Sequence, residues 1–354
     1  MSRPDFAFRT PSHTWRETGE AGVYSADPGG EPGGAEIRLT LESQQVPEDL
    51  LDEFLERAVT AWVLARGGRR LQLNGRARDI SPGDLDRLPS GPVSRVVSIA
   101  PSNAEIIGGL GAAELLVGVE SSTDFPPQVA GLPRLGPDLH VDLEALAALK
   151  PDLVLASLTV PGMERNIAGL DALGLPMLVT APQSLEGIEE DLLRVGAAIG
   201  REPAAQEAVA RMERSLAALE ASRPAGPPVR VFLQWWHQPM FTPGEACWSN
   251  ALIERAGGVN VFRGLPGQSA QVSPEAVAAA DPEVIFLCWC GVPSNKLNPG
   301  RVLRRSDLAS VTAVRQGRVY PLDEALVGRP GPRVVEGIAR MAELLRGGSG
   351  QDAQ

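Results

Sequence analysis

The sequence has few of the residues from which enzymes and disulfide-stabilised proteins are built. Its 354 residues include three cysteines and three histidines. An odd number of cysteines argues against a disulfide framework, and a structural zinc site normally needs four ligands. The motifs G-x-S-x-G, H-E-x-x-H and G-x-x-x-x-G-K-[ST] are also absent. We therefore expect buried, reduced thiols, no catalytic cofactor and no enzymatic activity.

Lysine and long apolar runs are scarce as well. Lys150 and Lys296 are the only lysines, and the net charge is -11, which gives no support for nucleic-acid binding. No window approaches 18 uninterrupted apolar residues, so we expect no membrane insertion. The first residues lack the apolar segment of a secretory signal. As written, the sequence predicts a cytoplasmic protein, or a periplasmic or otherwise extracytoplasmic one if the start is wrong.

Two segments precede the main pattern. Residues 1–34 are rich in Gly, Pro and polar residues, which predicts a flexible arm. Residues 35–90 form a predicted accessory strand–helix–strand module. Its first strand is the alternating run EIRLTL at 36–41, its helix begins at Pro47, and RLQL at 70–73 is its second strand.

From residue 93 the pattern changes to apolar strands alternating with helices, which predicts an α/β fold with parallel sheets. A first Rossmann-like lobe spans residues 93–184 and a second spans 228–346. Residues 185–224 are almost wholly helical in pattern and predict a long helical linker between the lobes. Residues 347–354 form a polar tail.

Five segments in a fixed order carry a resemblance to a known family. They are RVVSIAPSNAE at 95–105, DFPP at 124–127, LEALAALKPDLV at 143–154, VFLQWWHQPMFTPG at 231–244 and AGGVNVF at 256–262. The set resembles the helical-backbone (class III) substrate-binding proteins of ABC importers, closest to the cobalamin-binding members. This resemblance implies a monomer that clamps a small metal chelate between two lobes for delivery to an importer permease.

A corrin ring is large, flat and mostly apolar, so it needs aromatic plates and a few polar partners. In open α/β sheets such sites lie beyond the carboxyl ends of the strands. For the tryptophans the alternative is core packing. Together with the resemblance, these arguments give ten candidate ligand-binding residues: Ser102, Asn103, Phe125, His140, Trp236, His237, Phe241, Trp248, Trp289 and Arg329.

The imidazole of His237 is a candidate ligand of cobalt or iron, alone or together with His140. The alternative is a hydrogen-bonded loop histidine. The resemblance further implies that Glu144 and Glu254 dock onto importer arginines, one from each lobe; simple solvation is the alternative.

Three functions follow from these features. The first is binding of cobalamin or a related corrinoid, for ABC-type uptake or for intracellular scavenging. The second is binding of a ferric siderophore or haem by the same fold. The third, from another class, is a cytoplasmic protein of corrinoid or metal-cofactor assembly, for which Cys247, Cys288 and Cys290 are a thin supply of ligands.

Overall fold

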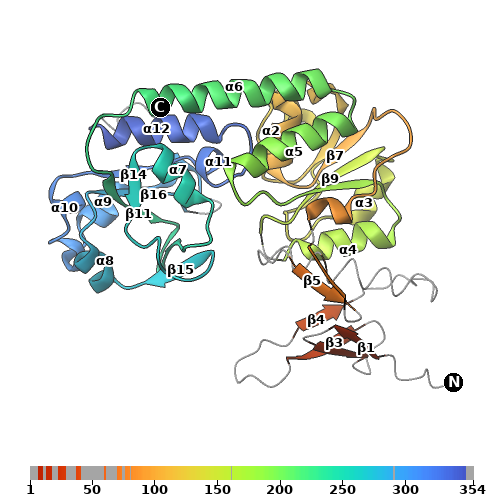
Figure 1. Cartoon of the computed structure of the whole chain (residues 1–354), viewed down its shortest axis with the longest axis horizontal. Coiled ribbons are helices and arrows are strands. Elements are labelled where there is room, and N and C mark those ends of the chain that lie inside the picture. Colours follow the sequence, from red (N-terminus) through yellow and green to blue (C-terminus); the bar gives the residue numbers. More distant parts are fainter. Residues whose placement is uncertain are drawn as a thin grey trace.

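The structure, a computed structural model, describes residues 81–160, 162–289 and 292–347, together with residue 60 and six N-terminal strands. Two α/β lobes lie side by side, and the long helix α6 (Glu202–Ala221) runs above both of them (Figure 1). None of the described helices combines the length and the apolar character that crossing a membrane requires.

The first lobe contains a parallel sheet in the order β10-β9-β7-β8. Its strands are apolar and almost wholly buried, because helices cover both faces of such a sheet. The strands are β7 (Val96–Ser98), β8 (Leu116–Val119), β9 (Leu153–Ser157) and β10 (Met177–Thr180). The helices are α2 (Pro101–Gly109), α3 (Leu143–Ala148), α4 (Glu164–Ala172) and α5 (Leu185–Ala198).

The second lobe repeats this plan. Its parallel sheet has the order β14-β11-β16-β17, so in both lobes the strands, numbered along the chain, lie in the order 2-1-3-4. The strands are β11 (Val229–Gln234), β14 (Gly258–Asn260), β16 (Val284–Leu287) and β17 (Val319–Pro321). The helices are α7 (Ser249–Arg255), α8 (Pro274–Ala280), α9 (Pro299–Leu303), α10 (Thr312–Arg315), α11 (Glu324–Val327) and α12 (Val334–Leu345).

A small antiparallel sheet, which the sequence pattern did not reveal, follows β11. It consists of β12 (Trp236–His237), β13 (Met240–Pro243) and β15 (Ser269–Val272). This sheet carries two of the aromatic candidates and His237.

The residues predicted as a helical linker contain α5, which belongs to the first lobe, and α6, the one long helix that joins the two lobes. Gly200 has φ +67° and ends α5, because few residues other than glycine adopt this left-handed conformation. The buried face of α6 carries Ala205, Ala208, Met212 and Leu216 at helical spacing. These residues join one hydrophobic cluster that includes core residues of both lobes. The linker is therefore part of a shared core.

The N-terminal prediction was partly wrong. Within residues 1–34 the structure has β1 (Ala7–Thr10), β2 (His13–Glu17) and β3 (Val23–Pro28), which form an antiparallel sheet with β4 (Ile37–Thr40). Strands this short carry too few alternating residues to be recognised beside Gly and Pro. β5 (Arg70–Leu73) pairs with β6 (Arg76–Asp79), and the helix expected after Pro47 falls outside the described residues apart from Thr60.

Residues at the end of the predicted accessory module pack onto the first lobe instead. Leu85 is fully buried in the core of that lobe, and Arg87 forms a β-bridge with Met177. The carboxylate of Asp86 accepts a hydrogen bond from the backbone N–H of Val179 at 2.8 Å. The first lobe therefore begins before residue 93.

The shared core predicts that both lobes lose stability together. Met212→Ala should lower the free energy of unfolding by about 2–5 kcal/mol, because it leaves a cavity in the cluster. Arg211→Ala, at the exposed neighbouring position, should change it by less than about 0.5 kcal/mol. Denaturant unfolding should show one shifted transition by fluorescence and by circular dichroism. Two separate transitions would contradict a shared core.

Candidate ligand-binding site

The strand order brings two loops together at the same place in each lobe. With the order 2-1-3-4, the chain leaves strand 1 toward one side of the sheet and strand 3 toward the other. The position between strands 1 and 3 is therefore the switch point, which is where open α/β sheets bind ligands. In the first lobe the switch point lies between β7 and β9, and in the second between β11 and β16.

Three rings gather at the switch point of the second lobe. The His237 ring is stacked on Trp289, with centroids 4.3 Å apart and planes at 18°. Trp236 lies 5.9 Å from Trp289 and 5.3 Å from His237. Trp289 is buried and its Nε1–H donates to Gln234 Oε1 at 3.2 Å, whereas Trp236 is 37% exposed. The buried ring thus fixes the cluster, and Trp236 presents apolar surface to solvent.

A tight hairpin builds this cluster. Trp236 and Phe241 are paired residues of β12 and β13, and the backbone N–H of Trp235 donates to the carbonyl of Phe241 at 2.8 Å. Phe241 is half-buried beside the cluster. Trp248 lies elsewhere, because it precedes α7 and packs against the shared core together with Trp235. The structure therefore gathers Trp236, His237 and Trp289 but leaves Trp248 in a packing role.

The two histidines differ in their surroundings. His237 Nδ1 is buried and accepts no hydrogen bond from any described residue, so the ring has an unused nitrogen. His140 is exposed in the first lobe, and its Nδ1 lies 3.3 Å from Arg165 Nη1. Nowhere in the described part of the chain do three or more His, Cys, Asp or Glu residues gather around a metal site. Cys247 and Cys288 are buried, and Cys290 lies outside that part.

Ser102 and Asn103 were predicted to contact the ligand, and this stays a prediction; the structure places both in buried positions of α2. Asn103 is fully buried; its amide donates to the carbonyl of Ala156 at 2.9 Å, and its Oδ1 accepts from the hydroxyl of Thr180 at 2.9 Å. Ser102 is also buried in the first turn of α2. Asn103 satisfies polar groups at the ends of β9 and β10, which a buried site requires.

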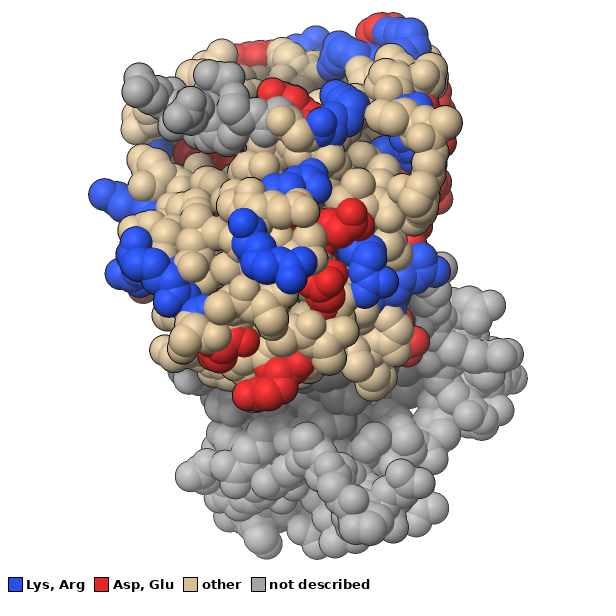
Figure 2. All heavy atoms as spheres, turned by 90° about the vertical axis from the view of Figure 1, so that its left-hand side faces the viewer, with Lys and Arg blue, Asp and Glu red and all other residues tan. Residues whose placement is uncertain are grey.

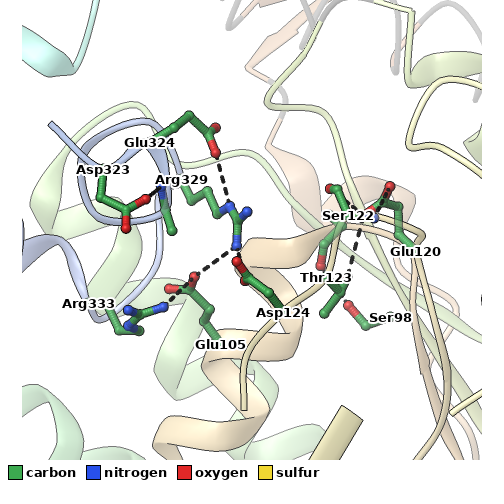
Figure 3. A network of polar contacts seen from close by, with 12 residues as sticks. Ser98, Glu105, Glu120, Ser122, Thr123, Asp124, Asp323, Glu324, Arg329 and Arg333 are labelled. Carbon is green, nitrogen blue, oxygen red and sulfur yellow. Dashed lines mark hydrogen bonds and ion pairs between the residues drawn. The ribbon is translucent and has the colours of Figure 1, made fainter. Parts of the chain in front are cut away.

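Phe125 and Arg329, also predicted to bind the ligand, both take part in contacts between the lobes. The guanidinium of Arg333 lies over the Phe125 ring, 4.5 Å from its centroid. Arg329 is paired with Asp124 at 2.6 Å, with Glu324 at 3.3 Å and more loosely with Glu105 (Figure 3). Arg329 therefore has its charge neutralised within the protein, and ligand binding is not needed to explain it.

Sequence reasoning missed the residues that complete this contact. Glu105 is fully buried on α2, and its Oε1 lies 3.4 Å from Arg333 Nη1. The carboxylate of Glu120 accepts the backbone N–H of Ser122 at 2.8 Å and so holds the loop that carries Asp124. The signal available in the sequence was the pair of arginines in RPGPR at 329–333, spaced to reach acidic partners.

The predicted docking glutamates are both exposed. Glu144 lies in the first turn of α3. Glu254 on α7 is paired with Arg263 at 3.0 Å and borders a cavity of about 490 Å³ that Arg223 and Arg255 also line. The two sites therefore differ in charge.

The lobes as a whole differ in the same way. Residues 81–227 contain 10 Lys and Arg against 20 Asp and Glu, whereas residues 228–347 contain 13 against 10. On the outer face of the second lobe, basic groups are spread among smaller acidic patches (Figure 2). The acidic character of the described chain is therefore concentrated in the first lobe and the linker.

Two α/β lobes of equal strand order, joined by a helix, define a two-lobe binding protein. The periplasmic binding protein family matches residues 96–326, and the chain belongs to this family. Its members are binding proteins for transport, and the chain is accordingly not an enzyme.

Relatives and solved structures agree with this assignment. The vitamin B12-binding protein of Vibrio cholerae is 26% identical over 255 residues, 72% of this chain and 90% of that protein. The crystal structure of BtuF, the periplasmic vitamin B12 binding protein of Vibrio cholerae, is similar to this chain with a TM-score of 0.64. The match covers 74% of this chain and 99% of BtuF, at 26% sequence identity. The structure of the periplasmic haem-binding protein RhuT from Roseiflexus is 28% identical in sequence, with a TM-score of 0.64. This match covers 72% of this chain and 98% of RhuT.

A Bacillus subtilis relative is described as an uncharacterised ABC transporter substrate-binding lipoprotein, 29% identical over 71% of this chain and 79% of its own length. These relatives are periplasmic proteins or lipoproteins. The expectation of a cytoplasmic location, and with it the alternative of cytoplasmic cofactor assembly, finds no support among them.

The buried position of Asn103 predicts a loss of stability on substitution. Asn103→Ala should lower the free energy of unfolding by about 1–3 kcal/mol, because it removes the buried hydrogen bonds that Asn103 makes with the Ala156 carbonyl and the Thr180 hydroxyl. Asn295→Ala, at an exposed site, should have little effect. Urea denaturation measures both. Equal stability of the two variants would argue that the hydrogen bonds of Asn103 to β9 and β10 do not stabilise the fold.

Proposed function

We propose that this protein binds a metal chelate with a large flat ring, a cobalamin-like corrinoid, between the carboxyl ends of its two sheets. The observation that carries the proposal is the cluster of Trp236, His237 and Trp289 at the switch point of the second lobe. Sites for such ligands combine aromatic surface with a few fixed polar groups.

The chemistry of the cluster suits a corrin. Trp236 has a partly exposed indole, and covering it with the apolar corrin ring of a ligand would be favourable. Trp289 is held in place by its hydrogen bond to Gln234, so little conformational freedom is lost on binding. Vitamin B12-binding relatives, matched over 90% or more of their own length, support the same ligand class.

Haem is the second candidate, and one observation favours it. His237 is half-buried in the aromatic cluster, stacked on Trp289, and imidazole is a common ligand of iron. The similarity to a haem-binding protein of known structure agrees with this candidate. An anionic ferric siderophore would instead need cationic partners, for which the first lobe offers Arg165 beside His140.

Binding of three probes separates these ligands. Titration calorimetry with cyanocobalamin should give a dissociation constant at or below the micromolar range, and haemin and a ferric hydroxamate siderophore should bind more weakly. Haemin binding that shifts the Soret band, and that His237→Ala abolishes, would replace the corrinoid by haem. Binding of none of the three would refute the proposal.

The aromatic cluster predicts a specific loss of affinity. Trp236→Ala should weaken cyanocobalamin binding about 10- to 100-fold, because about 1.4–2.7 kcal/mol of stacking and burial is removed. Leu193→Ala removes a similarly exposed apolar side chain from α5 and should leave affinity unchanged. Calorimetry of both variants checks this, and an equal effect on both would count against the site.

The ligand would then be delivered from outside the cytoplasm to an ABC importer permease, and Glu144 is the stronger docking contact. Glu254 is already neutralised by Arg263, whereas Glu144 is exposed in an acidic lobe. A basic surface on the permease would therefore attract the first lobe more than the second.

This difference between the lobes can be measured. With a vitamin B12 importer reconstituted in liposomes, Glu144→Arg should abolish stimulation of ATP hydrolysis, and Glu254→Arg should reduce it by about half or less. Glu202→Arg, in the exposed first turn of α6, is the charge-matched control. A larger effect of Glu254→Arg than of Glu144→Arg would reverse the assignment.

A further inference from the structure

Five charged residues that meet between the lobes form a cluster, here called the interlobe cluster. Glu105 and Asp124 belong to the first lobe, and Glu324, Arg329 and Arg333 to the second (Figure 3). The pairs that cross from one lobe to the other join residues more than 200 positions apart. Separation of the lobes would break the contact of Asp124 with Arg329 and the contacts of Glu105 with both arginines.

Glu105 lies at the centre of the cluster and is fully buried. Its Oε1 lies 3.4 Å from Arg333 Nη1 and 3.6 Å from Arg329 Nη1. Its Oε2 is buried and has no hydrogen-bond partner among the residues that the structure describes. Gly331 of the second lobe approaches so closely that a Cβ there would lie 3.0 Å from Oε2. The second lobe therefore covers the carboxyl group.

We propose that Glu105 is a proton-operated latch, whose carboxyl group takes up a proton as the second lobe closes over it. A carboxylate that loses water without gaining a full set of hydrogen bonds is destabilised, and a proton removes that cost. The inference concerns the lobes themselves and holds for any ligand.

The charged surroundings agree with this direction. Burial raises the pKa of Glu105 from the usual 4.5 to about 7, against the opposing effect of Arg333 and Arg329, and Asp124 adds to the rise. Beyond these, Arg329 also faces Glu324, and Arg333 lies 4.0 Å from Glu336. The arginines stay charged across the neutral range, so they do not titrate with Glu105.

The sign of the effect follows from proton linkage. In an open arrangement water reaches Glu105 and its pKa returns toward 4.5, so closing binds a proton between about pH 4.5 and 7. The closed arrangement is therefore favoured as the pH falls through 7. For these two pKa values, closure should be about ten-fold more favourable at pH 6 than at pH 8.

Amide hydrogen exchange of the ligand-free full chain tests the latch. After correction for intrinsic exchange rates, peptides covering residues 101–109 and 324–333 should be about ten-fold better protected at pH 6 than at pH 8. In Glu105→Gln, which keeps the shape of the neutral acid, protection should be high at both values. Arg333→Gln should move the midpoint to higher pH, because it removes a charge that lowers the pKa of Glu105.

Asp191 provides a matched control. Burial also raises its pKa to about 7, but its partner Arg194 lies on the same helix within the first lobe. Asp191→Asn should leave the exchange of the two interlobe peptides dependent on pH. A flat wild-type profile, or a pH dependence that survives in Glu105→Gln or disappears in Asp191→Asn, would overturn the proposal. If Glu105→Gln does not fold, the wild-type and Arg333→Gln profiles decide.

Discussion

A hydrophobic core that continues from one lobe through the linker into the other is the constraint on which the rest of the structure depends. Core residues of both sheets and the buried face of α6 belong to one cluster. Apolar packing of this kind is dense and resists sliding, so a large separation of the lobes would expose it, and only a small opening at the interlobe cluster is compatible with it. The proposed ligand site between the lobes would then be largely formed before a ligand arrives, and little affinity would be spent on ordering the protein.

The repeated strand order explains where that site lies, and the side chains explain why its halves differ. In both lobes the switch point lies between the first and third strands of the parallel sheet. Only the second lobe fills this position with the cluster of Trp236, His237 and Trp289. The first lobe uses Asn103 there as a brace between strands. The second lobe therefore presents aromatic surface, whereas the corresponding position of the first lobe is occupied by a hydrogen bond between strands.

Much of the fold could be predicted from the sequence, because buried parallel strands such as 152–157 and 284–290 are nearly continuous apolar runs. The aromatic candidates at the end of β11 were found for the same reason. The contacts of Phe125 with Arg333 and of Arg329 with Asp124 were not predicted, because the partners are distant in sequence. Local patterns carry no information on such pairs. The buried hydrogen bonds of Asn103 were not predicted, because the sequence pattern does not distinguish an asparagine in a loop from one that links two strands.

Gly331 has a consequence for the spacing of the lobes. Its backbone faces the carboxyl group of Glu105 with no room for a methyl group unless one side shifts by a few tenths of an ångström. The width of the gap between the two halves is thus set at this point by the absence of a side chain. A single added carbon would push the two lobes apart at a residue outside the aromatic cluster, so a substitution there would alter the spacing of the lobes around the proposed ligand site.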